Sequence, residues 1–176
     1  YTPYIKFPVT SDRQSGFLFP NIGYSSEDGV DITVPYYLNL AENYDATIVP
    51  HYVSKRGAGL EAEVRHLADW QKAIVTAGYL ADDDLFDGTY AKKDFEELFP
   101  GQRFEPADRW LFAVDQVGRV GSVDTIIDYA AVSDRDYFRD LGTSSLSVAN
   151  TTYLNQAVET GYQWQNWDML AKVQDY

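Results

Sequence analysis

The sequence predicts an all-β fold: an antiparallel up-and-down meander that forms part of a large transmembrane outer-membrane β-barrel. Three observations support this prediction. Apolar and polar residues alternate along many segments, which is typical of strands with one apolar and one polar face. Most of these segments are near the ~9–11 residues that a tilted strand needs to cross a bilayer. From mid-chain onward, tight turns alternate with long loops, as they do in such barrels.

The composition excludes several other classes of protein. A formal net charge of −13 over 176 residues argues against nucleic acid as a partner, because such binding needs a basic stripe. With 14 Tyr and 4 Trp the chain is too aromatic for an acidic disordered protein. It has no cysteine, which removes disulfides and thiol chemistry. No apolar run approaches the ~18 residues of a membrane helix.

The first expected hairpin contains two prolines, one in each strand. Its strands are 15–25 and 30–39, and a polar turn with a glycine joins them. In the second strand the even-numbered positions from 30 to 38 are apolar, whereas Asp31, Thr33 and Pro35 lie on the other face. Proline has no N–H for a sheet ladder, so Pro20 and Pro35 are unusual in strand interiors. Pro50 also falls within an expected strand, so a proline alone does not identify a special site.

The following strands repeat the alternation with charged residues on one face. Apolar residues at 60, 62 and 64 alternate with charged residues at 61, 63 and 65, and two aspartates face away from the apolar side of 122–132. We predict that the charged face is turned to a water-filled lumen. The lumen-facing candidates are Asp31, Glu61, Glu63, Arg65, Asp124 and Asp128.

Turn signals divide the chain into about nine strands. Tight turns are expected at 54–57, 69–72, 118–121 and 165–167, and long polar loops at 82–108 and 133–150. The expected strands are 15–25, 30–39, 45–54, 58–68, 72–81, 109–117, 122–132, 151–164 and 167–176. A soluble antiparallel β-sandwich shares this alternation and remains an alternative. So does a generic outer-membrane porin or receptor barrel.

The sequence contains no convincing catalytic or metal-binding set. His51 and His66 lie on different expected strands without cysteines or closely spaced carboxylates beside them. The acidic run at 82–84 lacks the ligand spacing of a calcium loop, and we expect it to be a solvated loop. Lys55 and Arg56 are expected to form a plain turn. We therefore expect no enzymatic activity, no cofactor and no metal.

The first part of the chain resembles the LptD family, the lipopolysaccharide-assembly proteins also called organic solvent tolerance proteins. The family pattern runs SGFL-P, then PYYWNIAPN-DAT, then RG and an ending like FRYL. Matching stretches are Ser15–Pro20, Pro35–Thr47, Lys55–Gly57 and Val64–Leu67, and fainter ones are Asp108–Phe112 and Val132–Phe138. Leu38, Glu42 and His66 stand where the family usually has Trp, Pro and Tyr.

The resemblance implies lipopolysaccharide transport and insertion at the outer membrane of a Gram-negative bacterium. It implies lipopolysaccharide itself, the lipoprotein LptE, the periplasmic bridge protein LptA and, during folding, the barrel-assembly machinery as partners. Residues 1–14 would be the junction with a periplasmic domain that is missing here, and residues 15–176 the first strands of the barrel.

The resemblance also gives the two prolines a role. In the family, the first and last strands meet at a lateral gate, which makes Pro20 and Pro35 gate candidates. An edge strand or a bulge is the alternative explanation. Nine strands are too few to close the family's barrel, so we expect a sheet whose edges pair with later strands or with another protein.

Overall fold

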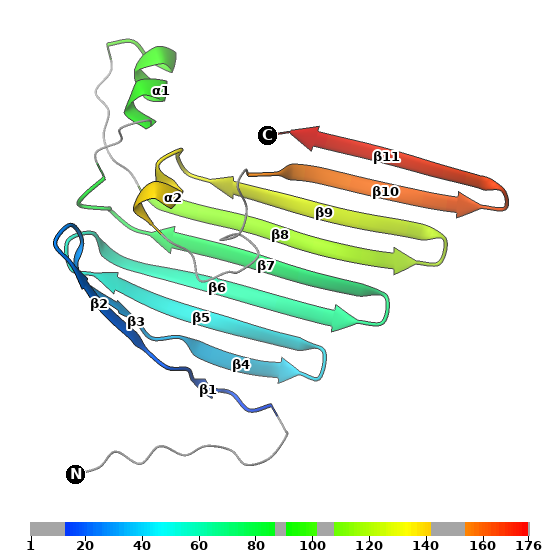
Figure 1. Ribbon diagram of the computed structural model, residues 1–176, viewed down its shortest axis with the longest axis horizontal. Coiled ribbons are helices and arrows are strands. Elements are labelled where there is room, and N and C mark those ends of the chain that lie inside the picture. The colour runs from blue at the N-terminus through cyan, green and yellow to red at the C-terminus, as the bar shows by residue number, and fades with distance from the viewer. Residues whose placement is uncertain (1–12, 87–90, 102–107, 142–153, 176) are drawn as a thin grey trace.

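The computed structural model describes residues 13–86, 91–101, 108–141 and 154–175 as a single antiparallel sheet with two short helices (Figure 1). The strands are β1 (Gly16–Phe17), β2 (Asn21–Ser25), β3 (Gly29–Thr33), β4 (Tyr36–Ala41), β5 (Tyr44–Val53), β6 (Gly57–Ala68), β7 (Gln71–Leu80), β8 (Arg109–Val120), β9 (Val123–Val132), β10 (Gln156–Trp164) and β11 (Trp167–Asp175). The helices are α1 (Ala91–Leu98) and α2 (Tyr137–Asp140). The predicted all-β meander is confirmed.

The strand order follows the chain. From β4 to β11 each strand pairs with its neighbour in sequence, and β1 pairs with β4, β2 with β3, and β3 with β5. The nine predicted strands appear as eleven, because the first two are each divided beside their proline. β9 and β10 match the strands predicted at 122–132 and 151–164, except that β10 begins at Gln156. Residues 142–153 and most of the predicted junction, namely residues 1–12, lie outside the described residues.

The two rims of the sheet differ. At the short-turn rim, two-residue turns join β4 to β5, β6 to β7, β8 to β9 and β10 to β11. The opposite loop rim carries the turns after β2 and β5 and the two long connections after β7 and β9 (Figure 1). The two long connections predicted as loops each contain a helix, α1 in the first and α2 in the second.

The register separates two faces of the sheet. Leu60, Tyr79 and Trp110 are cross-strand neighbours on the apolar face, and each is about half exposed, at 50%, 49% and 42%. Their sequence neighbours lie on the polar face, where Glu61 stands beside Gly78. An apolar surface that continues over so many strands marks contact with lipid or with another protein.

The buried core lies on the polar face, where α2 folds over the central strands. It consists of Leu80, Leu111, Ala113, Ala130, Tyr137 and Leu141. The aromatic ring of Tyr137 lies close above Gly78, where a Cβ atom would be 3.2 Å from the tyrosine hydroxyl. The absent side chain therefore makes room for the helix.

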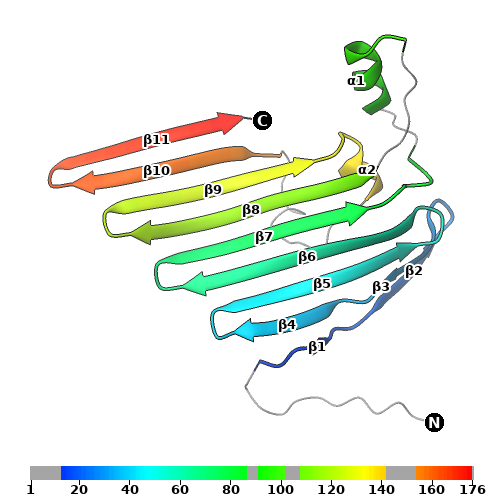
Figure 2. The same ribbon diagram turned by 180° about the vertical axis from the view of Figure 1, so that it is seen from behind.

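The described sheet is open. Figures 1 and 2 show β1–β3 at one edge and β11 at the other, and these edges do not pair with each other. Among the described residues, no helix is long and apolar enough to cross a membrane.

Candidate functional site

The first hairpin, residues 16–41, is interrupted at both predicted prolines. Pro20 lies between β1 and β2, and Pro35 lies between β3 and β4. Between the pairs Phe17↔Tyr36 and Asn21↔Thr33, the first strand has three residues and the second has two. This extra residue shifts the register by one, as a β-bulge does. The prolines thus lie where the ladder of the hairpin is broken, in contrast to the continuous strands predicted.

The nitrogen atoms of Pro35 and Pro50, which carry no hydrogen, both face the side of the sheet where the first hairpin forms the edge. The Leu18 N–H donates to the Pro35 carbonyl at 2.8 Å, and the Val34 N–H donates to the Pro50 carbonyl at 3.2 Å. In an antiparallel pair of this kind each residue normally donates one bond and accepts one. Neither proline can return the bond, so each pair keeps half of its usual hydrogen bonds.

Pro50 lies within a strand, as expected, and does not interrupt it. β5 continues from Tyr44 to Val53 and pairs with β6 along its whole length, including Pro50↔Leu60. The Pro50 carbonyl faces Val34, so its nitrogen faces that side too. The missing donor is therefore directed at the first hairpin and away from β6, and we name Pro20, Pro35 and Pro50 the proline line.

The outer edge of the hairpin is apolar, and no other strand of the described residues pairs with it. Phe17 is 76% exposed, Phe19 is 80% exposed, and Ile22 and Tyr24 are similarly exposed. A strand edge with free backbone groups and large apolar side chains is a surface on which another strand can add. Whether this edge is a lateral gate stays a prediction.

The six lumen-facing candidates all lie on the polar face. The register aligns Asp31 with Val53, Val49 with Glu61, and Asp124 with Arg119. By the same alternation Glu63, Arg65 and Asp128 share this face. Facing a lumen remains a prediction, but their separation from the apolar residues follows from the register.

Most of these charges have a partner close by. His51 Nε2 lies 2.7 Å from an Asp31 oxygen, and Arg65 Nε donates to Asp45 at 2.6 Å. Arg119 pairs with Asp124, and Asn155 donates to Asp128 at 2.7 Å. These charges are thus ion-paired or hydrogen-bonded to neighbours on the polar face.

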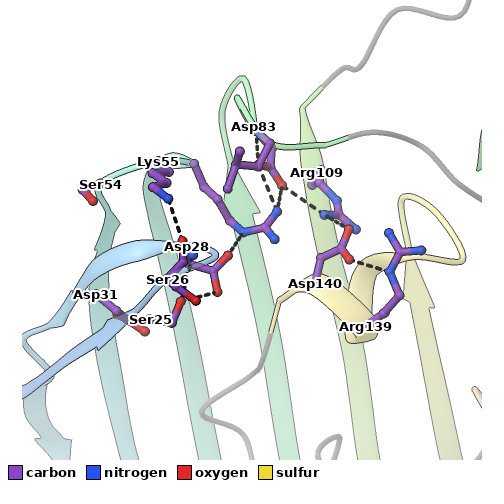
Figure 3. A network of polar contacts seen from close by, with 12 residues as sticks. Ser25, Ser26, Asp28, Asp31, Ser54, Lys55, Asp83, Arg109, Arg139 and Asp140 are labelled. Atoms are coloured by element: carbon purple, nitrogen blue, oxygen red, sulfur yellow. Dashed lines mark hydrogen bonds and ion pairs between the residues drawn. The ribbon is translucent and has the colours of Figure 1, made fainter.

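A buried ion network at the loop rim was not anticipated (Figure 3). Arg109 is fully buried and donates to Asp83 at 3.0 Å, to Asp140 at 3.0 Å and to Asp134 at 2.8 Å. Arg56 Nη1 donates to both oxygens of Asp83, at 3.0 Å to the Oδ2 atom that Arg109 also contacts and at 3.2 Å to Oδ1. The expectation of a solvated acidic run is wrong for Asp83, which is 4% exposed.

The network continues to the first hairpin and to α2. Lys55 and Arg56 lie in a tight turn, as expected, and Arg56 Nε also donates from it to Asp28 in the β2–β3 turn at 2.7 Å. The guanidinium of Arg109 also lies 4.3 Å from the Phe86 ring centre and 5.6 Å from that of Tyr137. Burial, reinforced by the charge of Glu61, raises the pKa of the Tyr137 hydroxyl to about 12. The signal for this network in the sequence was Arg109, which stands between an acidic loop and an apolar strand.

An open antiparallel meander with one apolar and one polar face defines the class of this protein: it is a segment of an outer-membrane β-barrel. The family model described as LPS transport system D matches residues 107–176. The chain thus matches this family, LptD, which confirms the resemblance seen in its sequence.

Curated relatives match the chain along nearly its full length. The "LPS-assembly protein LptD" of Saccharophagus degradans is 42% identical over 99% of this chain and 21% of its own length. The protein of that name from Pseudomonas aeruginosa strain UCBPP-PA14 is 41% identical over 100% of this chain and 18% of its own. That of Bordetella pertussis is 38% identical over 99% and 20%. The chain spans about a fifth of the length of these relatives.

Proposed function

We propose that this chain supplies the first strands of a barrel that transports and inserts lipopolysaccharide at the outer membrane of a Gram-negative bacterium. The relatives are named LPS-assembly proteins, which supports lipopolysaccharide as the substrate. The apolar face would meet the membrane, and the polar face would line the lumen. Transport by such a barrel requires no bond to be made or broken, so we assign it no catalytic role.

The single observation that carries the proposal is the proline-interrupted edge. Lipopolysaccharide has acyl chains that belong in the membrane and sugars that must stay outside it. A seam that parts sideways meets both needs, whereas a sealed barrel does not. Each lost ladder bond is worth about 1 kcal/mol net, so breaks at Pro20 and Pro35 would loosen a seam without destroying it. These two residues are our proposed lateral gate.

The remaining assignments follow from the match to this family. We propose that residues 1–14 connect the barrel to a periplasmic domain and that residues 15–176 are its first strands. LptE, LptA and the barrel-assembly machinery are the proposed protein partners. A generic porin or receptor barrel would share the fold but would not need a weakened first hairpin.

The experiment replaces Pro20 and Pro35 together by valine in the full-length protein. Restored N–H groups should tighten the seam, so lipopolysaccharide export should fall and outer-membrane permeability to large antibiotics should rise. Both are measured in cells that depend on the variant. Pro100→Val is the matched control, because Pro100 lies outside the sheet. Unchanged export and permeability in the double variant would make the prolines tolerated edge residues and remove the gate.

A further inference from the structure

We propose that the ion network at the loop rim pins the turn of the first hairpin to the sheet, so that the seam opens by bending at the proline line. Arg56 is the positioning residue of this pin. The inference rests on the function proposed above and specifies which part of the hairpin moves and which part stays.

The turn end of the hairpin is held by many short contacts. Arg56 Nε donates to Asp28 at 2.7 Å, and Lys55 Nζ donates to the Ser26 carbonyl at 2.7 Å (Figure 3). The Val30 N–H donates to Ser54 Oγ at 2.9 Å, and the Ser54 N–H donates back to the Val30 carbonyl at 2.8 Å. These contacts join the β2–β3 turn and the start of β3 to the turn after β5.

The anchor of these contacts lies inside the protein. Arg56 reaches Asp83, whose side chain is fully buried and also accepts a hydrogen bond from Arg109. Arg109 in turn belongs to β8 and binds Asp134 and Asp140 beside α2. Because one carboxylate joins two buried guanidinium groups, neither can leave without stranding a buried charge. The turn of the hairpin is thus tied to the centre of the sheet.

The other end of the hairpin is held more weakly. β1 pairs with β4 through two residues, Gly16 and Phe17. Arg13 contacts Asp45 at 3.3 Å, with more than half of its side chain exposed to solvent, where ion pairs contribute little. The Asn39 N–H donates to Ser15 Oγ at 2.8 Å, also at an exposed position.

The proline line separates the two ends. Pro20, Pro35 and Pro50 each stand next to the boundary between the β2–β3 half and the β1–β4 half. At this boundary the missing donors of Pro35 and Pro50 face Leu18 and Val34. Pro50 extends the weak line into a third strand, where it faces the hairpin and leaves the β5–β6 ladder intact. Bending at this line moves β1 outward and leaves the pinned turn in place.

Hydrogen–deuterium exchange on the full-length purified complex tests the pin. In the unmodified protein, amides of residues 22–32 should exchange more slowly than those of residues 16–19. Asp28→Asn removes the negative charge that faces Arg56, which weakens their contact, but leaves Arg56 paired with Asp83. Exchange at 22–32 should then become about tenfold faster, as expected for the loss of one charge-assisted hydrogen bond. Glu27→Gln is the matched control: it changes the same charge in the same turn, and Glu27 has no ion pair within the described part of the chain.

The outcomes separate the pin from the gate. Equal exchange in the two halves of the unmodified hairpin, or no effect of Asp28→Asn, would overturn the pin whatever the export assay shows. A protected turn that Asp28→Asn releases would support the pin, even if the double proline variant exported lipopolysaccharide normally and so removed the gate. Arg56→Gln should release the turn at least as much as Asp28→Asn, and a smaller effect would also contradict the proposal.

Discussion

The first hairpin and the central meander share one sequence pattern but are held in different ways. In both, apolar and polar residues alternate, and in both the register places them on opposite faces. β6, β7 and β8 run for 12, 10 and 12 residues and are paired on both sides. The four strands of the hairpin have two to six residues each, and within the described part of the chain their outer edge has no strand partner.

The difference shows that alternation and hydrogen bonding determine separate properties. Alternation decides which face of the sheet a side chain occupies. The supply of N–H donors decides how firmly a strand is bound, and three prolines reduce this supply along one line. The buried ion network adds a second contrast, since it stiffens the central meander and reaches the hairpin at its turn alone.

The largest effect should come from removing the centre of the firmly held region. Arg109→Ala would leave Asp83, Asp134 and Asp140 near one another in a buried site without their shared cation. Removal of one partner of a buried ion pair typically costs about 3–5 kcal/mol. We expect a clear drop in the thermal unfolding midpoint of the full-length protein in detergent.

The control for this prediction is Arg119→Ala at the short-turn rim. Arg119 pairs with Asp124, and 59% of its side chain is exposed, so its replacement should not change the midpoint measurably. Equal midpoints for the two variants would mean that the buried network does not distinguish the central meander.

A moderate effect should come from filling the space beneath α2. At Gly78 a Cβ atom would lie 3.2 Å from the Tyr137 hydroxyl and 3.5 Å from the Leu111 Cβ. Gly78→Val should therefore displace α2, at the ~1–3 kcal/mol typical of overpacking. Limited proteolysis near residues 137–140 and the unfolding midpoint would measure this.

The matched substitution in the hairpin is Gly16→Val. At Gly16 an added Cβ meets nothing within 4 Å, so this variant should unfold like the unmodified protein. If Gly16→Val were as damaging as Gly78→Val, the hairpin would be packed as closely as the centre, and the contrast between the regions would fail.

Sequence alone was sufficient for the properties that depend on neighbouring residues. A strand predicted at 58–68 is observed at Gly57–Ala68, because the period of two and the flanking glycine are both local. The faces of Glu61, Glu63 and Arg65 follow from the same period. The helix α1 could also have been found, since Ala91, Phe95 and Leu98 have the spacing of an apolar helix face.

The ion network could not be derived in this way. Asp83 and Arg109 are separated by a long connection, and Arg56 comes from a different turn. Which carboxylate meets which guanidinium depends on how the loops fold back, and no local pattern encodes this. Likewise, a proline in a sequence shows that a donor is missing but not which neighbouring strand lacks it. Only the strand register shows that the missing donor of Pro50 faces the hairpin.

The smallest effect, and the sharpest test of the contrast, should come from Pro50→Val. The new N–H at position 50 would face the Val34 carbonyl and complete their pair, a gain of about 1 kcal/mol net. Loss of proline also frees the unfolded chain, which costs about 0.4–1 kcal/mol, so the two terms nearly cancel. We therefore expect an almost unchanged unfolding midpoint, slower hydrogen exchange at the Val34 amide, and a new amide at position 50 that is protected from exchange. Pro100→Val, outside the sheet, should leave exchange at the Val34 amide unchanged. If the new amide at position 50 exchanged as fast as an exposed one, its donor would not reach the hairpin, and Pro50 would not belong to the proline line.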